Sequence, residues 1–231
     1  MKLSIIITCF NEKATIRQAI GIAKNLGTDK EIIVIDNCST DGSREILKSM
    51  EDGSVKIVFQ PKNLGFGQSV RTGAALARGE FIYVHYADIE YDIECVHRML
   101  ELARKEDLDA VFGSRLYNNK KSVFSLVRER PYYLGTIVTT FLINLFYGRN
   151  FTDIIGTRLY RKSSFEKLNI ESTGMAFDFE VVSKLCKYGF KIRETPVIYK
   201  ARSVREGKKI KPIDIVPALL MILKVKLFNR V

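Results

Sequence analysis

The chain has 231 residues, of which 46% are hydrophobic and 27% charged, with only five prolines, a composition typical of one folded globular domain. Its two histidines argue against a histidine-based zinc centre, and its four scattered cysteines, without a CxxC pair, indicate reduced thiols. The net charge of +11 is uneven, since residues 1–114 carry −3 and residues 115–231 carry +14, so we expect the second half to meet an anionic partner.

Strand-like and helix-like segments alternate regularly through the first half of the chain. Apolar strands are predicted at residues 2–10, 30–39, 54–60, 80–88 and 108–115. Helices are predicted between them, at residues 11–27, 40–50, 63–79 and 92–107. This strict alternation predicts an α/β fold with a doubly wound, mostly parallel sheet flanked by helices.

The second half is more basic and contains two long apolar segments. Residues 134–147 are almost wholly apolar, and as a helix they would be roughly 21 Å long, short of the ~30 Å hydrocarbon core of a bilayer. The remaining predicted elements are strands at 151–162 and 191–202, a helix at 175–189, and an apolar helix at 215–228 with Asp214 as its N-cap and Pro217 in its first turn. Because no apolar run is long enough for a signal peptide or a membrane span, we expect a cytoplasmic protein.

Polar residues follow four of the predicted strands where each strand ends. They are Thr8, Phe10, Asn11 and Glu12 after the first strand, Asp36, Asn37 and Ser39 after the second, Asp88 and Glu90 after the fourth, and Gly113, Ser114 and Arg115 after the fifth. Ligands of open α/β sheets bind at the edge formed by the carboxyl ends of the strands. A carboxylate after the second strand suits contact with a ribose or base, and acidic residues after the fourth strand suit a divalent cation. The alternative is that these residues form turns and helix caps, as we expect for Asp92 before the next helix.

These segments together resemble the family 2 glycosyltransferases with a GT-A fold. The resemblance is carried by SIIITCFNE, IIVIDNCSTDGS, NLGFGQSVRTGAALARGEFI, the step from Ala87 to Asp88, FGSR, and the loop from Arg202 to Lys209. It extends from about Leu3 to Lys211. Within the family the sequence is most similar to the synthases that make polyprenyl-phosphate or dolichyl-phosphate sugars.

The resemblance implies a nucleotide-sugar site with a divalent cation, Mg²⁺ or Mn²⁺. Asp88 would be the remaining carboxylate of the family's DxD metal motif, with Glu90 as a second ligand. The other implied substrate contacts are Thr8, Phe10, Glu12 and Asp36 toward the nucleotide, Arg115, Arg202, Lys208 and Lys209 toward phosphates, and Asn37, Ala87 and Ser114 as further substrate-binding residues. Arg202 would also stabilise the departing diphosphate, and Asp178 or Glu180 would lie near the sugar or the acceptor.

Two positions depart from the family pattern. The first aspartate of the metal motif aligns with Tyr86, and the second aspartate of the family's DDxS motif aligns with Asn37. A phenol stays protonated near neutral pH and cannot replace a carboxylate as a ligand of a hard cation. Asp88, Glu90 and the diphosphate would then have to hold the metal, since Mg²⁺ often needs only one or two carboxylates besides phosphates.

By resemblance, the chain is expected to be an inverting, metal-dependent hexosyltransferase that moves a sugar from UDP or GDP to a polyprenyl phosphate. A lipid phosphate is already an anionic nucleophile, whereas a saccharide hydroxyl, the alternative acceptor, would need a general base such as Asp178. A second alternative, motivated by Tyr86, is a catalytically silent subunit that binds sugar nucleotides or docks on membranes. A nucleic-acid partner is not expected, because the basic residues lack interleaved stacking aromatics.

The apolar segments suggest where such an enzyme meets its lipid. Arg128 and Arg130 precede the helix at 134–147, and Lys224 and Lys226 lie on the last helix, a pattern typical of peripheral binding to the inner face of the cell membrane. The alternative is that both helices pack on the core or on a second copy in a homo-oligomer. The expected organisation is a GT-A domain at 1–211, with a nucleotide-binding half (1–115) and an acceptor half (116–211), followed by a C-terminal amphipathic or apolar helix at 212–231.

Overall fold

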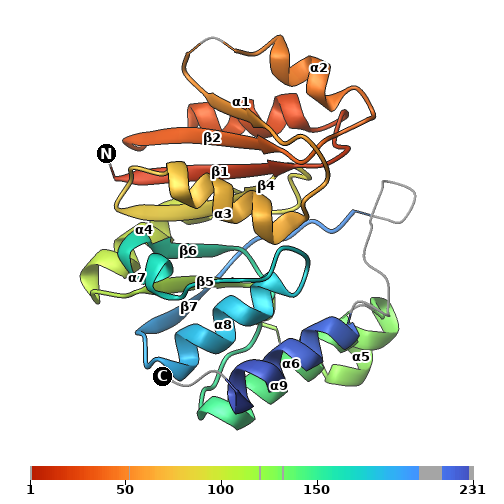
Figure 1. Cartoon of the computed structure of the whole chain (residues 1–231). Helices are drawn as coiled ribbons and strands as arrows, with labels where there is room; N and C mark the ends of the chain where they lie inside the picture. Colours follow the sequence, from red (N-terminus) through yellow and green to blue (C-terminus); the bar gives the residue numbers. More distant parts are fainter. Residues whose placement is uncertain (1, 52, 120, 132, 203–214, 229–231) are drawn as a thin grey trace.

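The computed structural model describes residues 2–51, 53–119, 121–131, 133–202 and 215–228. Their centre is a seven-stranded sheet in the order β3-β2-β1-β4-β6-β5-β7 (Figure 1). The strands are β1 (Leu3–Cys9), β2 (Lys30–Asp36), β3 (Lys56–Phe59), β4 (Phe81–Tyr86), β5 (Ala110–Ser114), β6 (Arg158–Arg161) and β7 (Ile192–Pro196). Every pairing is parallel except those of β6, which runs antiparallel to β4 and β5. The predicted mostly parallel α/β sheet is confirmed.

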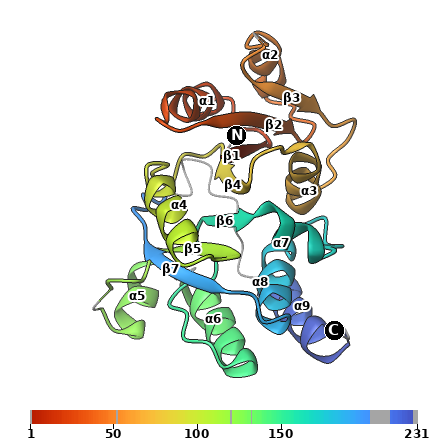
Figure 2. The same cartoon turned by 90° about the vertical axis from the view of Figure 1, so that its left-hand side faces the viewer.

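Helices cover both faces of this sheet, as Figure 2 shows in a view along the strands. The helices are α1 (Ile16–Asn25), α2 (Ser43–Lys48), α3 (Phe66–Leu76), α4 (Cys95–Lys105), α5 (Val123–Glu129), α6 (Tyr133–Tyr147), α7 (Lys162–Lys167), α8 (Phe177–Lys187) and α9 (Ile215–Leu227). Helices α1 and α4 pack on one core and α3 and α8 on the other. The short helices α5 and α7 were not among the predicted elements.

Strand β1 shows how one segment serves two cores. Ile5 and Ile7 are buried in the core under α1 and α4, whereas Ile6 is buried in the core under α3. Successive side chains of a strand point to opposite faces, so a strand covered by helices on both sides must be apolar at every position. The continuous apolar run of this strand therefore reflects its central place in the sheet.

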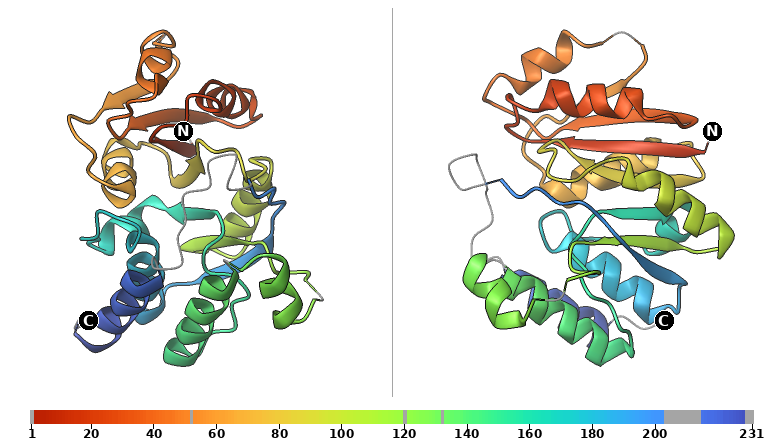
Figure 3. Two further views of the ribbon diagram at one scale, coloured as in Figure 1. Left: turned by 90° about the vertical axis from the view of Figure 1, so that its right-hand side faces the viewer. Right: turned by 180° about the vertical axis from the view of Figure 1, so that it is seen from behind.

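Three helices lie together at the end of the molecule farthest from β3, where α6 packs against both α5 and α9 (Figures 1 and 3). We call the exposed apolar side chains of these helices, together with Phe228 directly after α9, the apolar end. Its members are Val123, Phe124, Leu134, Phe141, Leu145, Val216, Leu220, Leu223, Leu227 and Phe228. None of the helices in the described parts of the chain has the length and hydropathy needed to cross a membrane.

Some expectations fall on residues that the structure does not describe. These are the N-cap role of Asp214, the phosphate contacts of Lys208 and Lys209, and the domain boundary at residue 211. Pro217 occupies the third position of α9, where its missing N–H leaves no intrahelical hydrogen bond unmade.

Candidate active site

A cavity of about 370 Å³ opens at the carboxyl edge of the sheet, where β1 and β4 end. Ten of the residues predicted from the sequence line it: Thr8, Phe10, Glu12, Asn37, Ala87, Asp88, Glu90, Arg115, Asp178 and Arg202. The start of α3 closes one side, where Gly65 has a φ of +91° and a Cβ would lie 2.4 Å from the Thr173 carbonyl oxygen. The glycine of this turn is therefore required by backbone geometry beside the cavity.

Two predicted substrate contacts, Asp36 and Ser114, lie behind the cavity wall. The fully buried Asp36 carboxylate accepts the Ser39 N–H at 3.2 Å and pairs with Arg44 at 3.3 Å. The Ser114 hydroxyl is 2.6 Å from the Thr152 hydroxyl. Their side chains hold the loops that carry the cavity residues following β2 and β5.

Asn37, the residue after Asp36, does reach the cavity and joins two loops there. Its side-chain oxygen accepts the Leu64 N–H at 2.8 Å, and its amide donates to the Asn63 side chain at 2.9 Å. The amide groups therefore fix the turn before α3 against the loop after β2. Asn63 was not singled out from the sequence, because an asparagine in a glycine-rich turn is first explained by the turn itself.

Arg202 lies among three carboxylates that come from distant parts of the chain. Its guanidinium nitrogens are 2.8 Å from Glu12, 3.5 Å from Asp88 and 3.8 Å from Glu90. The segment after β7 crosses the ends of β1 and β4 and so brings Arg202 to this position (Figure 3). A β-bridge between Tyr91 and Tyr199 holds the segment, and the Arg202 backbone N–H donates to Glu90 at 2.7 Å. We name the three carboxylates and Arg202 the Arg202 cluster.

Crowding of acids in the Arg202 cluster perturbs Asp88. Burial, the Glu90 carboxylate and Glu12 raise the pKa of Asp88 to about 6, against the lowering effects of the Glu90 N–H and of Arg202. The folded protein therefore binds a proton between about pH 4 and 6 that the unfolded chain has released. In this window the contribution of Asp88 to stability falls as the pH rises.

Asp88→Asn is accordingly expected to stabilise the metal-free protein at pH 7. The gain in the free energy of unfolding should be roughly 1–2 kcal/mol, less than the full pKa shift would give because the carboxylate is partly exposed. Urea unfolding in EDTA at pH 7, 6, 5 and 4 checks this. The gain should be complete above pH 6 and should vanish near pH 4, and a pH-independent difference would contradict the assignment.

Asp92 has a different place from the one expected. Helix α4 begins at Cys95 with Glu94 in the N-cap position, and the Asp92 carboxylate accepts the Glu94 N–H at 3.0 Å. The prediction that Asp92 caps this helix was wrong, because a turn separates Asp92 from its first residue.

Tyr86 forms part of an aromatic wall instead of a metal site. Its ring stacks on Phe66 at a centroid distance of 5.7 Å and contacts Tyr91 at 5.9 Å. Burial, followed by the Asp178 charge, raises the pKa of the Tyr86 phenol well above its ordinary value, so the hydroxyl stays neutral. Tyr86 is therefore not an anionic ligand.

The donor set at the cavity fits a divalent cation that arrives together with a diphosphate. Among the described residues, no three acidic, histidine or cysteine side chains form a ready-made metal site. Asp88 and Glu90 supply carboxylate oxygens at the cavity wall. Because Mg²⁺ usually keeps only one or two protein carboxylates beside substrate phosphates, these two residues suit such a cation.

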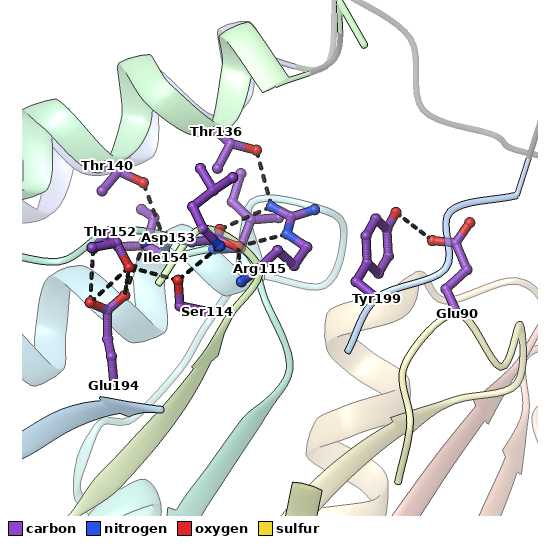
Figure 4. A network of polar contacts seen from close by, with 12 residues as sticks. Glu90, Ser114, Arg115, Thr136, Thr140, Thr152, Asp153, Ile154, Glu194 and Tyr199 are labelled. Atoms are coloured by element: carbon purple, nitrogen blue, oxygen red, sulfur yellow. Dashed lines mark hydrogen bonds and ion pairs between the residues drawn. The ribbon is translucent and has the colours of Figure 1, made fainter. Parts of the chain in front are cut away.

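Arg115 is held more firmly than a free phosphate-binding arginine (Figure 4). Its guanidinium is bound at 2.6 and 2.9 Å by the fully buried Asp153 and at 3.1 Å by Thr136 of α6. It also lies over the rings of Tyr133 and Tyr199. Burial raises the pKa of Asp153, but Arg115 outweighs this and holds it below its usual range. Arg115 thus joins α6 to the cavity wall.

Asp178 lies in the first turn of α8 and lines the cavity, in an ion pair with Arg158 of β6. The side chain is only 13% exposed, so Asp178 does not lie on a solvent-facing side of the helix. Burial raises the pKa of Asp178, and Arg158 opposes this effect. The nearby Glu180 pairs with Lys184 at 2.6 Å and accepts the Ser172 N–H at 2.8 Å, so it braces a loop and does not line the cavity.

Comparison with known proteins identifies the family that this chain matches and the relatives that it resembles. The family model of glycosyl transferase family 2 matches residues 4–169. The low-salt glycan biosynthesis hexosyltransferase Agl6 of Haloferax volcanii is 29% identical over 204 residues, which cover 87% of this chain and 48% of that protein. The undecaprenyl-phosphate mannosyltransferase of Micrococcus luteus is 28% identical over 218 residues, covering 90% of this chain and 87% of that protein. The chain thus spans about half the length of Agl6 and most of the mannosyltransferase.

Solved structures share the same architecture. Glucosyl-3-phosphoglycerate synthase from Mycobacterium tuberculosis, in complex with Mn²⁺, UDP and phosphoglyceric acid, has a TM-score of 0.64 at 14% identity, covering 99% of this chain and 80% of that chain. A likeness at this identity concerns the fold. With the family match over most of the sequence, it follows that the chain belongs to glycosyl transferase family 2 and has the GT-A fold.

Proposed function

We propose that the protein transfers a hexose from a UDP- or GDP-sugar to a polyprenyl phosphate at the cytoplasmic face of a membrane. The observation that carries the proposal is the link between the cavity and the apolar end. Arg115 lines the cavity and donates a hydrogen bond to Thr136 of α6, the helix that exposes Phe141 and Leu145. The name of the Micrococcus luteus relative, an undecaprenyl-phosphate mannosyltransferase, supports the same acceptor class.

The chemistry of the leaving group accounts for the cavity residues. An oxygen of the acceptor phosphate attacks the anomeric carbon, the bond from that carbon to the diphosphate oxygen breaks, and the configuration inverts. Arg202 lies where a guanidinium can stabilise the negative charge that grows on the diphosphate. Asp88 and Glu90 would hold a Mg²⁺ or Mn²⁺ ion, which supplies further stabilisation of that charge when bound.

No general base is needed for a phosphate acceptor, which is ionised at pH 7. Asp178 lies in an ion pair with Arg158, which favours the charged carboxylate, while burial leaves the pKa of Asp178 raised. An acceptor that arrives as an anion needs no proton transfer to this carboxylate.

A radiolabelled transfer assay tests the proposal directly. The purified protein is given a panel of UDP- and GDP-hexoses, a polyprenyl phosphate in detergent or vesicles, and Mg²⁺ or Mn²⁺. A labelled lipid product that is stable to phosphatase and labile to mild acid is the expected result. Absence of lipid-linked product with every donor would overturn the proposal.

The same assay separates the remaining functions. A saccharide-hydroxyl acceptor is favoured by one observation, the placement of Asp178 in the cavity with a raised pKa. Transfer to soluble sugars that Asp178→Asn abolishes would establish it. Nucleotide binding that Mn²⁺ does not enhance, without transfer to any acceptor, would instead identify a silent subunit, which the position of Tyr86 suggests.

We infer that the apolar end rests on the membrane. Leu134, Phe141 and Leu145 of α6 are 51–62% exposed, and on the neighbouring α9 Lys224 is 54% exposed, 3.8 Å from Glu171, and follows the exposed Leu223. Monomeric soluble proteins rarely expose a large contiguous apolar surface, and apolar side chains with lysines beside them suit anionic headgroups. The same surface would also serve a homo-oligomer, which the experiment below distinguishes.

The double variant Phe141→Glu/Leu145→Glu is expected to reduce binding to vesicles that contain anionic lipid by at least ~10-fold, since each change removes buried apolar area and adds a repelled charge. Vesicle co-sedimentation measures this. Gln18→Glu on α1, at the other end of the molecule, is the control and should bind as wild type does. Equal binding by the double variant, or a change from dimer to monomer without loss of vesicle binding, would contradict membrane docking.

A further inference from the structure

The Arg202 cluster holds three carboxylates against one guanidinium. All four side chains are largely shielded, with Glu12 12%, Asp88 25%, Glu90 10% and Arg202 19% exposed. Carboxylates shielded from water destabilise the protein unless a positive charge lies nearby. When all three carboxylates are ionised, the net charge of the Arg202 cluster is negative even with Arg202 present. Among the described residues, Arg202 is therefore the counter-ion of these acids in the ligand-free protein.

The same guanidinium is incompletely satisfied. Its Nη atoms donate to Glu12 at 2.8 and 3.2 Å, but its Nε is buried without a hydrogen-bond partner among the described residues, at 3.8 Å from Glu90. Glu90 has other partners, since the Tyr199 hydroxyl donates to it at 2.7 Å. A guanidinium with a buried, unused donor can gain a hydrogen bond by turning toward an incoming phosphate oxygen.

A metal ion and Arg202 compete for the same oxygens. Asp88 and Glu90 are the carboxylates that suit the cation, and both lie within 4 Å of the guanidinium. Two cations at that separation repel each other strongly in a shielded site. A divalent ion can bind there with high affinity only after the charge of Arg202 has been moved or neutralised.

We propose that Arg202 is an exchangeable counter-ion that makes nucleotide and divalent cation bind cooperatively. In the ligand-free state it occupies the carboxylate cluster and opposes cation binding. When the nucleotide diphosphate binds, Arg202 pairs with its oxygens and leaves Asp88 and Glu90 to the cation. This inference rests on the proposed function, because it requires a nucleotide diphosphate in the cavity.

The proposal can be tested by binding measurements alone, without sugar transfer, because the effects of two ligands on each other's affinity are reciprocal. If the nucleotide raises the affinity for the cation, the cation must raise the affinity for the nucleotide by the same factor. Removing the positive charge of Arg202 should reduce this coupling by the same factor for both ligands. The cation should then bind more tightly on its own, and the nucleotide should raise its affinity only through the direct contacts between cation and diphosphate.

The experiment is a titration of Mn²⁺, followed by electron paramagnetic resonance, with and without UDP or GDP. For wild type we expect weak Mn²⁺ binding alone and tightening by roughly 10-fold or more with the matching nucleotide, a size typical of such couplings. Arg202→Gln should bind Mn²⁺ alone about 10-fold more tightly than wild type and show a coupling factor clearly smaller than that of wild type. Arg202→Lys, which keeps the charge, should retain weak binding of Mn²⁺ alone.

Arg78→Gln is the matched control, because Arg78 pairs with Glu31 with 76% of its side chain exposed, outside the cavity. It should leave both affinities unchanged, which excludes an effect of net charge. If Arg202→Gln unfolds, Arg202→Met replaces it, with thermal melting as the check. Unchanged Mn²⁺ affinity in the folded variant, while wild type binds nucleotide, overturns the counter-ion role alone. Failure of wild type to bind either nucleotide overturns the proposed function and this inference together.

Discussion

Replacement of Asp88 by asparagine is expected to lower sugar transfer by ~10²- to 10³-fold, the usual cost of removing one group that stabilises transition-state charge. Asparagine has nearly the same shape but cannot offer the anionic oxygen that a hard cation requires. The nucleotide-dependent binding of Mn²⁺ should be lost in parallel. Steady-state transfer rates at saturating donor, together with Mn²⁺ titrations, measure both effects.

The matched control is Asp92→Asn, in the same loop. Asp92 is exposed, and within the described part of the chain its carboxylate accepts only the Glu94 N–H, a hydrogen bond that an asparagine oxygen can also accept. This variant should keep transfer within about twofold of wild type. Because Asp88→Asn is also expected to be more stable than wild type, lost activity cannot be attributed to unfolding. Full activity of Asp88→Asn would show that the cation, if one is used, is held elsewhere.

The second large effect concerns stability. Arg115→Met is expected to lower the free energy of unfolding by about 3–5 kcal/mol, because it leaves the fully buried Asp153 without its charge partner. Urea unfolding at pH 7 measures the loss. The pKa of Asp153 lies below its ordinary value, so the pair stabilises the protein above about pH 4 and this contribution is lost as the pH falls further. The difference from wild type should therefore shrink in acid.

Two further variants separate the buried charge from the general effect of losing an arginine. Arg193→Met removes an arginine from an exposed ion pair with Glu106 and should cost less than about 1 kcal/mol. The double variant Arg115→Met/Asp153→Asn removes the unpaired charge but keeps an acceptor for the Ile155 N–H, so it should recover part of the stability. A double variant as unstable as Arg115→Met would mean that the loss arises from the packing of Arg115 on Tyr133 and Tyr199.

The fold could be predicted because its signal is local and repeated. A strand such as β2 is apolar at Ile32, Ile33, Val34 and Ile35 because both faces of the sheet are covered, and the helices between strands show their own apolar spacing. Strict alternation then leaves few topologies. The direction of β6 could not be predicted, since the residue pattern of a strand of four residues is compatible with both parallel and antiparallel pairing.

The position of Asp88 could likewise be predicted, because a residue directly after a parallel strand lies at the edge where ligands bind. The ion-pair partners of the residues at this edge could not be predicted. Arg115 was expected to face phosphates and is bound by Asp153, and Asp178 is paired with the buried Arg158, the first residue of β6. An arginine next to apolar strand residues suggests a buried acidic partner, but it does not identify which one.

The alternating sheet, the edge at which polar residues gather and the family resemblance can be recognised from the sequence, because each depends on residues close together in the chain. The contact of Arg202 with Glu12, 190 residues away, and the burial of Asp36 behind the cavity that Asn37 lines are seen only in the folded protein. Such contacts depend on how strands and loops pack in three dimensions. Neighbouring residues of a strand point to opposite faces of the sheet, so a shift of one residue along the strand places a side chain in the core instead of in the cavity.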